Sequence, residues 1–130
     1  MKSRLILLLA LVGLFVLSSC SLLNLDNQSL TKGVDGSLIG QATLICDRAC
    51  SERGQCGTAE QGAMILLNSS APAAVNHDMA VPAGTIVQIN QTEPRNVTQY
   101  SDNATFPISY YLVTVPDRGF GWVAGWCVGQ

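Results

Sequence analysis

Hydrophobic and polar positions divide this chain of 130 residues into three parts. Residues 5–17 read LILLLALVGLFVL and contain no charged or hydrogen-bonding side chain. Residues 21–36 mix Ser, Asn, Asp and Gly with scattered leucines and show no sustained period, so we predict a flexible tether. From residue 37 onward, short apolar runs are separated by segments rich in Gly, Pro and polar residues, a pattern that favours β-strands.

Five apolar runs in residues 37–130 predict short strands. They cover residues 38–46, 63–67, 86–90, 110–115 and 121–128. The fourth run alternates strictly, so Tyr111, Val113 and Val115 should share one face of a strand, with Tyr110 on the other. The intervening polar segments predict long loops at 47–62, 68–80 and 91–107. Without a convincing helical stripe after residue 17, we expect an all-β fold, either a sandwich or a small barrel.

The N-terminal segment has the parts of a secretory signal peptide. Lys2 and Arg4 precede the apolar run, and the small residues Ser18 and Ser19 follow it. The run is too short for a transmembrane helix, which needs about 20 apolar residues. We therefore expect residues 1–19 to be a signal peptide that is removed on export.

The string Leu17-Ser18-Ser19-Cys20 resembles the lipobox of bacterial lipoproteins. That resemblance implies that the Cys20 thiol takes a diacylglyceryl group and that cleavage leaves Cys20 as the new N-terminus. Two acyl chains give stable membrane anchoring, whereas one gives only marginal binding. The expected location is the bacterial cell envelope, on the outer face of a membrane. The alternative is an ordinary signal peptide that ends near a cysteine.

Charge and cysteine content narrow the class of protein. Residues 20–130 carry five basic and nine acidic side chains, a net charge of −4 without the chain ends. No basic patch is present, so we expect no nucleic-acid partner. Four cysteines besides Cys20 in a small exported domain predict two disulfides. They are Cys46, Cys50, Cys56 and Cys127.

Three disulfide pairings are open. We favour Cys46 with Cys127, which would join the two terminal strands, and Cys50 with Cys56, which would close a short loop. Zinc is the rival interpretation, because the Cys-x3-Cys spacing at 46–50 occurs in metal sites. The lone His77 and the oxidising compartment argue against zinc, so we expect no metal and no cofactor.

The last fifty residues resemble a bacterial SH3 domain of the envelope-exposed SH3b type. Three stretches carry the resemblance: VPAGTIV at 81–87, YYLV at 110–113, and GWV followed by GW at 121–126. Residues 37–80 match poorly and lack the family's Asn-x-Arg signature. The resemblance implies an SH3-like barrel in residues 37–130, with long, disulfide-stapled loops, that binds a peptide or a cell-wall ligand.

Aromatic residues gather near the C-terminus and provide the candidate binding residues. Tyr and Trp suit binding surfaces because they bury a large area and keep a polar tip. We expect a ligand groove formed by Tyr110, Tyr111, Phe120 and Trp126. The residues that we expect to be structural are Trp122, Gly84 and Gly121. A bend at Gly125 should turn Trp126 away from the face that Trp122 occupies.

The remaining polar residues give no catalytic pattern. His77 stands beside Asp78, but no Ser or Cys nucleophile has a partner pattern. Charged residues that flank the cysteine loop, among them Arg48 and Arg53, are either a binding contact or a solvated loop. We therefore expect a non-catalytic binding module that contacts a peptide, a glycan or an envelope protein. The alternative is an inhibitor of an envelope-directed enzyme such as lysozyme, because periplasmic lysozyme inhibitors are also small disulfide-bonded β lipoproteins.

Overall fold

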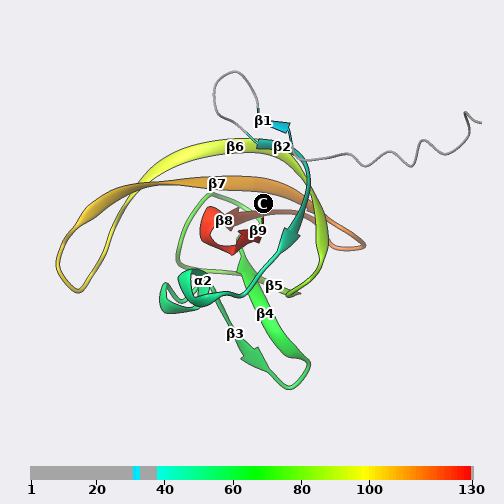
Figure 1. Cartoon of the computed structure of the whole chain (residues 1–130), viewed down its shortest axis with the longest axis horizontal. Helices are drawn as coiled ribbons and strands as arrows, with labels where there is room; N and C mark the ends of the chain where they lie inside the picture. Colours follow the sequence, from blue (N-terminus) through cyan, green and yellow to red (C-terminus); the bar gives the residue numbers. More distant parts are fainter. Residues whose placement is uncertain (1–30, 33–37, 130) are drawn as a thin grey trace, which may run out of the picture.

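The computed structural model describes residues 31–32 and 38–129 (Figure 1). The predicted signal peptide, Cys20 and most of the predicted tether at 21–36 lie outside the described residues. Within that tether, β1 (Thr31–Lys32) pairs antiparallel with the start of β2 (Leu38–Leu44), so this short piece is part of a sheet. None of the described helices has the length and apolar character needed to cross a membrane.

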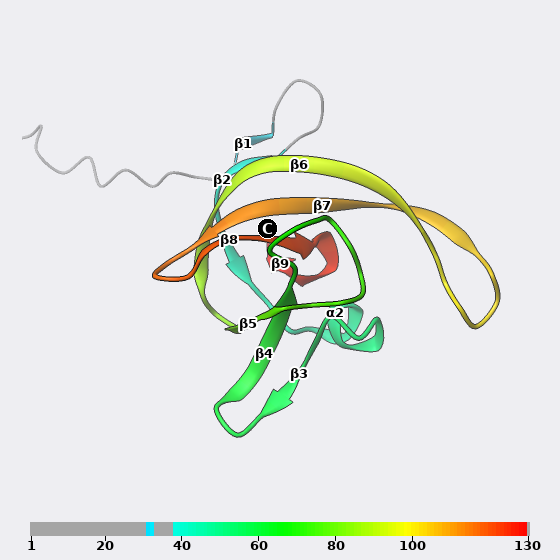
Figure 2. The same ribbon diagram turned by 180° about the vertical axis from the view of Figure 1, so that it is seen from behind.

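The larger sheet is antiparallel and has the strand order β1-β2-β6-β7-β8. Its longest members are β6 (Ile86–Thr98) and β7 (Thr105–Val115), which pair along most of their length with an irregularity between Ile89 and Gln91. β8 (Gly119–Ala124) continues the sheet beyond β7, and β9 (Val128–Gly129) pairs with the end of β2. Figures 1 and 2 show β6 and β7 as a long arch, with β1 above it and α2, β3, β4 and β5 below it.

A second, three-stranded antiparallel sheet lies below this arch in both views. It has the order β3 (Cys56–Ala59), β4 (Gly62–Leu67) and β5 (Met79–Pro82). The short helix α2 (Arg48–Glu52) connects β2 to this sheet. The Asp47 carboxylate accepts a hydrogen bond from the Cys50 backbone N–H and so caps the start of the helix.

The all-β class is confirmed, and each of the five predicted strand segments contains a strand: β2, β4, β6, β7 and β8. The predicted loop at 91–107 is wrong, because β6 runs on to Thr98 and β7 already begins at Thr105. This outer part of the hairpin exposes much of both faces, so its strands carry no alternating apolar pattern. The helix α2 was not expected either, since five residues are too few to show a helical stripe.

A closed barrel, as the SH3 resemblance implied, is not formed by the described residues. No ladder joins β8 to β9; the chain itself connects them through the 3-10 helix η1 (Gly125–Cys127). The predicted final strand 121–128 is therefore broken at the expected bend. A Cβ on Gly125 would lie 2.8 Å from the Ser109 carbonyl oxygen, so the chain turns where only glycine fits without movement.

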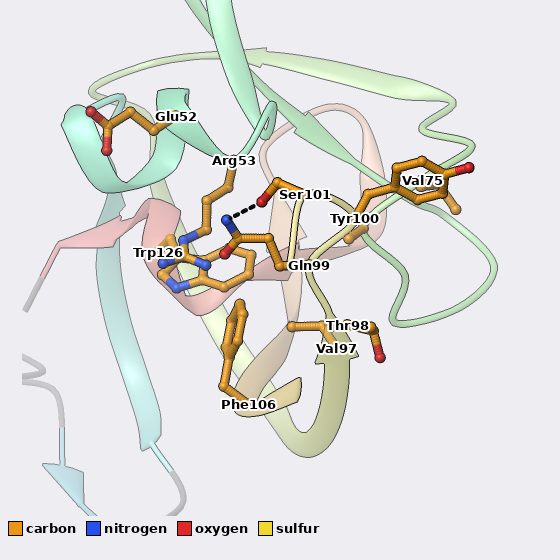
Figure 3. A pocket seen from close by; sticks show the side chains of 11 residues that line it. Glu52, Arg53, Val75, Val97, Thr98, Gln99, Tyr100, Ser101, Phe106 and Trp126 are labelled. Carbon is orange, nitrogen blue, oxygen red and sulfur yellow. Dashed lines mark hydrogen bonds between the residues drawn. The ribbon is translucent and has the colours of Figure 1, made fainter. Parts of the chain in front are cut away.

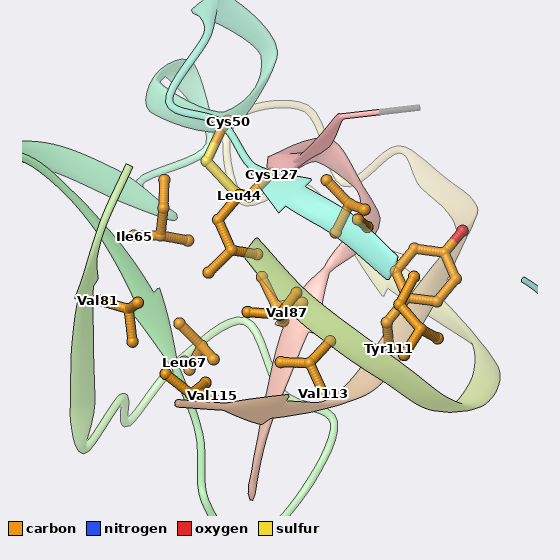
Figure 4. Packing of buried hydrophobic residues seen from close by; sticks show 14 of the residues in the cluster. Leu44, Cys50, Ile65, Leu67, Val81, Val87, Tyr111, Val113, Val115 and Cys127 are labelled. Carbon is orange, nitrogen blue, oxygen red and sulfur yellow. A yellow bond between two sulfur atoms is a disulfide. The ribbon is translucent and has the colours of Figure 1, made fainter. Parts of the chain in front are cut away.

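The main hydrophobic core lies between the two sheets and extends to α2 and η1 (Figure 4). The predicted alternation of β7 is confirmed, since Tyr111, Val113 and Val115 all belong to this core. On the other face of β7, Tyr110 packs in a smaller cluster. The labelled core residues include Leu44, Ile65, Leu67, Val81 and Val87.

Both glycines that we expected to be structural have identifiable roles. Gly84 adopts a positive φ of 89° in the turn between β5 and β6, a conformation that favours glycine. Gly121 is buried in β8, and a Cβ on it would lie 3.0 Å from a Leu67 side-chain carbon. Backbone conformation explains the first glycine, and close packing explains the second.

All four expected cysteines form disulfides, but the expected pairing is wrong. The bonds join Cys46 to Cys56 and Cys50 to Cys127. Helix α2 is the physical reason, because it buries Cys50 against η1, where Cys127 lies. Cys46, between β2 and α2, is left beside the first residue of β3. The long-range bond therefore ties the helix, and not the first strand, to the C-terminal segment.

Candidate ligand-binding pocket

A pocket of about 540 Å³ opens beside the outer part of the β6–β7 hairpin. This volume falls in the range of about 300–1,000 Å³ that is usual for small-ligand sites. Four segments form its walls: the end of α2, the loop before β5, the hairpin tip and η1. The lining residues are Glu52, Arg53, Ala74, Val75, Val97, Thr98, Gln99, Tyr100, Ser101, Phe106 and Trp126.

One side of the pocket is formed by a guanidinium group packed against two aromatic rings (Figure 3). The guanidinium carbon of Arg53 lies 4.4 Å from the ring centroid of Trp126 and 4.7 Å from that of Phe106. The two ring centroids are 5.9 Å apart, and the ring planes are inclined by 58°. Each such cation–π contact stabilises by about 0.5–1 kcal/mol at an exposed site. The two contacts hold the Arg53 side chain within the pocket.

The Cys50–Cys127 disulfide joins the two elements that carry Arg53 and Trp126. Arg53 is the C-cap residue of α2, three positions after Cys50, and Trp126 immediately precedes Cys127 in η1. The bond joins the two short elements with a Cα–Cα distance of 5.0 Å. The positions of the cation and its aromatic partner are therefore set by a covalent link between segments far apart in the sequence.

Gln55 provides a second connection across the pocket. Its side chain, 2% exposed, donates from Nε2 to the carbonyl oxygens of Arg53 (3.1 Å) and Ala74 (3.0 Å). Its Oε1 accepts a hydrogen bond from Nε2 of His77, because an amide oxygen cannot donate. Burial lowers the pKa of His77, and the neighbouring charge of Asp78 opposes that shift. His77 thus holds the loop in place and has a structural role.

The hairpin tip supplies the polar part of the pocket wall, because Thr98, Gln99 and Ser101 carry hydroxyl and amide groups. Gln99 Nε2 donates to Ser101 Oγ at 2.9 Å, and the backbone N–H of Gln99 donates to the Ala104 carbonyl. Tyr100 is fully exposed. The tip therefore presents one aromatic ring to solvent beside the pocket.

Of the four predicted groove residues, only Trp126 lines this pocket. The expected placement of Tyr110 and Tyr111 in an open groove is wrong, since they are 1% and 6% exposed. β7 is a central strand, and clusters of apolar side chains cover both of its faces at this point. Phe120 is 59% exposed but belongs to β8 and does not line the pocket.

Trp122 is half-buried and packs on the smaller cluster around Tyr110, in keeping with a structural role. Its backbone N–H donates to the Asn68 carbonyl, and its own carbonyl accepts from the Asn68 N–H. Trp126 packs against both clusters and is also half-buried. The two tryptophans thus differ mainly in that Trp126 reaches the pocket.

Sequence reasoning missed Phe106 and Tyr100 as site residues and left Arg53 undecided. Phe106 belongs to the C-terminal part of the chain in which aromatic residues gather, and Arg53 flanks the cysteine loop, so partial signals existed. Their contact depends on the disulfide between α2 and η1, which the expected pairing did not contain. Tyr100 lies in a segment that was expected to be a loop and has no neighbouring motif.

A buried hydroxyl lies close to the pocket wall. The Tyr110 hydroxyl has no hydrogen-bond partner among the described residues, and burial raises the pKa of this side chain. The cluster around Tyr110 includes Ala74, Val97 and Trp126, which also line the pocket. Leaving a buried polar group without a partner costs about 1–3 kcal/mol.

The described residues contain no group of three or more His, Cys, Asp or Glu side chains that could hold a metal ion. No family model, curated protein or solved structure matches this chain. The proposed function therefore rests on the geometry of the pocket and on the sequence.

Proposed function

We propose that this chain is a non-catalytic binding module, anchored to the outer face of a bacterial membrane by lipid on Cys20. Its ligand is a peptide or another component of the cell wall, and the pocket around Arg53 is where that ligand binds. One observation carries the proposal: a guanidinium packed against two aromatic rings lies in an open pocket of about 540 Å³.

The pocket suits binding because its parts are already in place. The Cys50–Cys127 bond and the Gln55 hydrogen bonds connect its walls in the free protein. Binding to a preformed site avoids the cost of ordering loops and side chains. The walls also carry aromatic, amide, hydroxyl and guanidinium groups. Such groups bind a ligand through packing and hydrogen bonds and leave it chemically unchanged.

The location rests on sequence features that precede the described domain. The signal peptide at 1–19 and the lipobox at 17–20 support export and lipid anchoring. Two disulfides are in keeping with an oxidising compartment outside the cytoplasm. No nucleic acid enters the proposal, because the chain lacks a basic patch.

We also propose a distant relationship to SH3b domains. The three motifs that carry the resemblance fall at the turn between β5 and β6, in β7, and from β8 to η1. The last strand, β9, returns to pair with β2, which also pairs with β6. This arrangement of an incompletely closed sheet supports the relationship, although the three-stranded second sheet is an addition to it.

A sedimentation experiment tests the binding function. The full chain, purified in detergent, is mixed with insoluble peptidoglycan and centrifuged. We expect it to appear in the pellet, and an unrelated lipoprotein in the same detergent serves as the control. Recovery of the chain in the supernatant at all protein concentrations would reject a cell-wall ligand.

The second candidate function is inhibition of an envelope-directed enzyme such as lysozyme. The observation that favours it is the β6–β7 hairpin, which extends away from the other elements (Figure 1) and carries a fully exposed Tyr100 near its tip. Such a hairpin is able to enter an enzyme cleft. Lysozyme activity on a cell-wall substrate, with and without the full chain, separates the two functions. Strong inhibition that Tyr100→Ala removes would favour the inhibitor.

A further inference from the structure

We infer that the Arg53 pocket selects a ligand with a free carboxylate next to an apolar group, and that this ligand is the C-terminal end of a peptide. The inference rests on the proposed function, because it takes the pocket as the binding site. It adds the chemical class that the site recognises.

Arg53 has hydrogen-bond donors that the fold does not use. The aromatic rings contact its guanidinium carbon, but no described residue provides a hydrogen-bond acceptor or an acidic partner for this side chain. A guanidinium carries five N–H donors in one plane. The donors are arranged as a fork that matches the two oxygens of a carboxylate. A bound carboxylate would therefore use a group that the fold has positioned but not satisfied.

The neighbouring acidic side chains are engaged elsewhere. Glu52 lines the same pocket, but its carboxylate forms an ion pair with Arg48 one turn earlier in α2. Asp102 on the hairpin is not among the lining residues, and its carboxylate accepts a hydrogen bond from the Ala104 N–H. Of the two charged residues that line the pocket, Arg53 is thus the one without an ionic partner. Its positive charge favours an anionic ligand.

The pocket also has apolar parts. Val75, Val97 and Phe106 line it together with the exposed ring of Tyr100, and Figure 3 shows Val75 and Tyr100 across the pocket from Arg53. A volume of about 540 Å³ leaves room for several ligand groups besides the carboxylate. A peptide terminus with small apolar side chains places its carboxylate on Arg53 and its side chains against these walls. An acidic sugar shares the carboxylate but offers mainly hydroxyl groups to the apolar surface.

Nuclear magnetic resonance of the full chain in detergent tests this inference. The signals to follow are the Nε–H of Arg53 and the indole N–H of Trp126. The probes are acetyl-Ala-Ala-Ala with a free carboxylate, the same peptide as its C-terminal amide, and glucuronate. We expect the acid to shift both signals and to bind about tenfold more tightly than the amide, because it alone forms charge-assisted hydrogen bonds. We expect glucuronate to bind more weakly than the peptide acid.

Two variants at exposed positions provide the controls. Arg53→Gln should remove the preference for the acid over the amide. Arg95→Gln should leave it intact, because Arg95 pairs with Glu93 on the same hairpin and lies outside the pocket lining.

The outcomes are distinct from those of the peptidoglycan experiment. Equal binding of acid and amide would reject a carboxylate site while leaving the pocket as a binding site. The absence of shifts with both carboxylate probes would reject it as well. Tighter binding of glucuronate would keep the carboxylate and reject the peptide. Failure to sediment with peptidoglycan would count against the proposed cell-wall ligand alone.

Discussion

Tyr110 and Tyr111 are neighbours in β7, yet they serve different parts of the fold. Tyr111 belongs to the main core, and Tyr110 belongs to the smaller cluster next to the pocket. Burial raises the pKa of both side chains, and the neighbouring Ser109 side chain opposes the shift for Tyr111. The hydroxyl of Tyr110 has no partner among the described residues. Similar side chains therefore make different contributions to stability.

Removing the two hydroxyls should separate these contributions. Tyr111→Phe removes a hydroxyl that interacts with the Ser109 side chain, so we expect the free energy of unfolding to fall by up to about 1 kcal/mol. Tyr110→Phe removes an unsatisfied polar atom, so we expect no loss, or a gain of up to about 1 kcal/mol. Urea denaturation measures both values. A loss in Tyr110→Phe as large as that in Tyr111→Phe would mean that the Tyr110 hydroxyl is satisfied in solution.

The bend at Gly125 offers a second test at the level of single residues. Gly125→Ala would place a Cβ 2.8 Å from the Ser109 carbonyl oxygen and should destabilise the protein by about 1–3 kcal/mol, as overpacking does. Gly57→Ala is the matched control, because a Cβ on Gly57 would meet no atom within 4 Å and the φ of this residue is not positive. Equal thermal midpoints of the two variants would show that the turn before Trp126 is not tightly packed.

Among the elements, those with a buried apolar pattern were predictable from the sequence. The alternation in β7 and the β-branched run in β6 identified both strands, because one or both faces lie against apolar neighbours. The outer part of the β6–β7 hairpin was not predictable by this route. Its strands are held by main-chain pairing between largely polar residues, and their register follows from the inner part of the same hairpin.

The pocket was less predictable than the strands, because its residues meet only in the folded chain. Trp126 was expected from its aromatic character and from the glycine before it. Arg53 was not assigned to the site, since its position depends on α2, a five-residue helix with a single capping side chain. The same helix reversed the expected disulfide pairing. The short helix α2, which leaves no periodic pattern in the sequence, thus accounts for both the missed role of Arg53 and the wrong disulfide pairing.

The two disulfides should make different contributions to the pocket. Replacing Cys50 and Cys127 together by Ser opens a link across 77 positions, whereas replacing Cys46 and Cys56 together opens one across 10. The loop-entropy model predicts that the first pair costs more, by about 1–2 kcal/mol. Only the first change should also weaken acetyl-Ala-Ala-Ala binding, because it separates α2 from η1. Equal binding by the two double variants would contradict this role of the long-range bond.

The loop between β4 and β5 should lose stability at low pH. Folding lowers the pKa of His77 below 6.5 through burial, and that of Asp78 below 3.8 through hydrogen bonds with Ser69. The stabilisation that each group provides is complete above its ordinary pKa. It is lost as the pH falls through the lowered pKa of the folded state. We expect unfolding free energy to decline from about pH 6.5 downward and more steeply below about pH 4. His77→Gln should flatten the upper part of this curve, and an unchanged slope would contradict the assignment.

At the level of the whole molecule, β6 and β7 lie between the N-terminal strand β1 and the helix α2, whose end lines the pocket. Figures 1 and 2 both show β1 above the arch of β6 and β7, and α2 below it. The first described strand and the α2 wall of the pocket are thus on opposite sides of β6 and β7.

Anchoring is tested by Cys20→Ala. We expect the variant either to appear in the soluble envelope fraction or to accumulate with its signal peptide uncleaved, because it lacks the thiol that we propose as the lipid acceptor. Cell fractionation and the apparent mass of the product distinguish these results from the wild type. A variant that is cleaved normally and still partitions with the membrane would contradict a lipid anchor.

The most direct test of the proposed binding site measures how much full-length protein sediments with purified peptidoglycan when the pocket is altered at exposed positions. The double variant Arg53→Gln/Tyr100→Ala removes the guanidinium and the exposed ring without emptying the core, and Arg95→Gln is its control. We predict that the double variant binds about tenfold more weakly than the wild type, a loss of about 1.4 kcal/mol, and that the control binds like the wild type. Equal sedimentation of the wild type and the double variant would contradict the claim that this pocket holds the ligand.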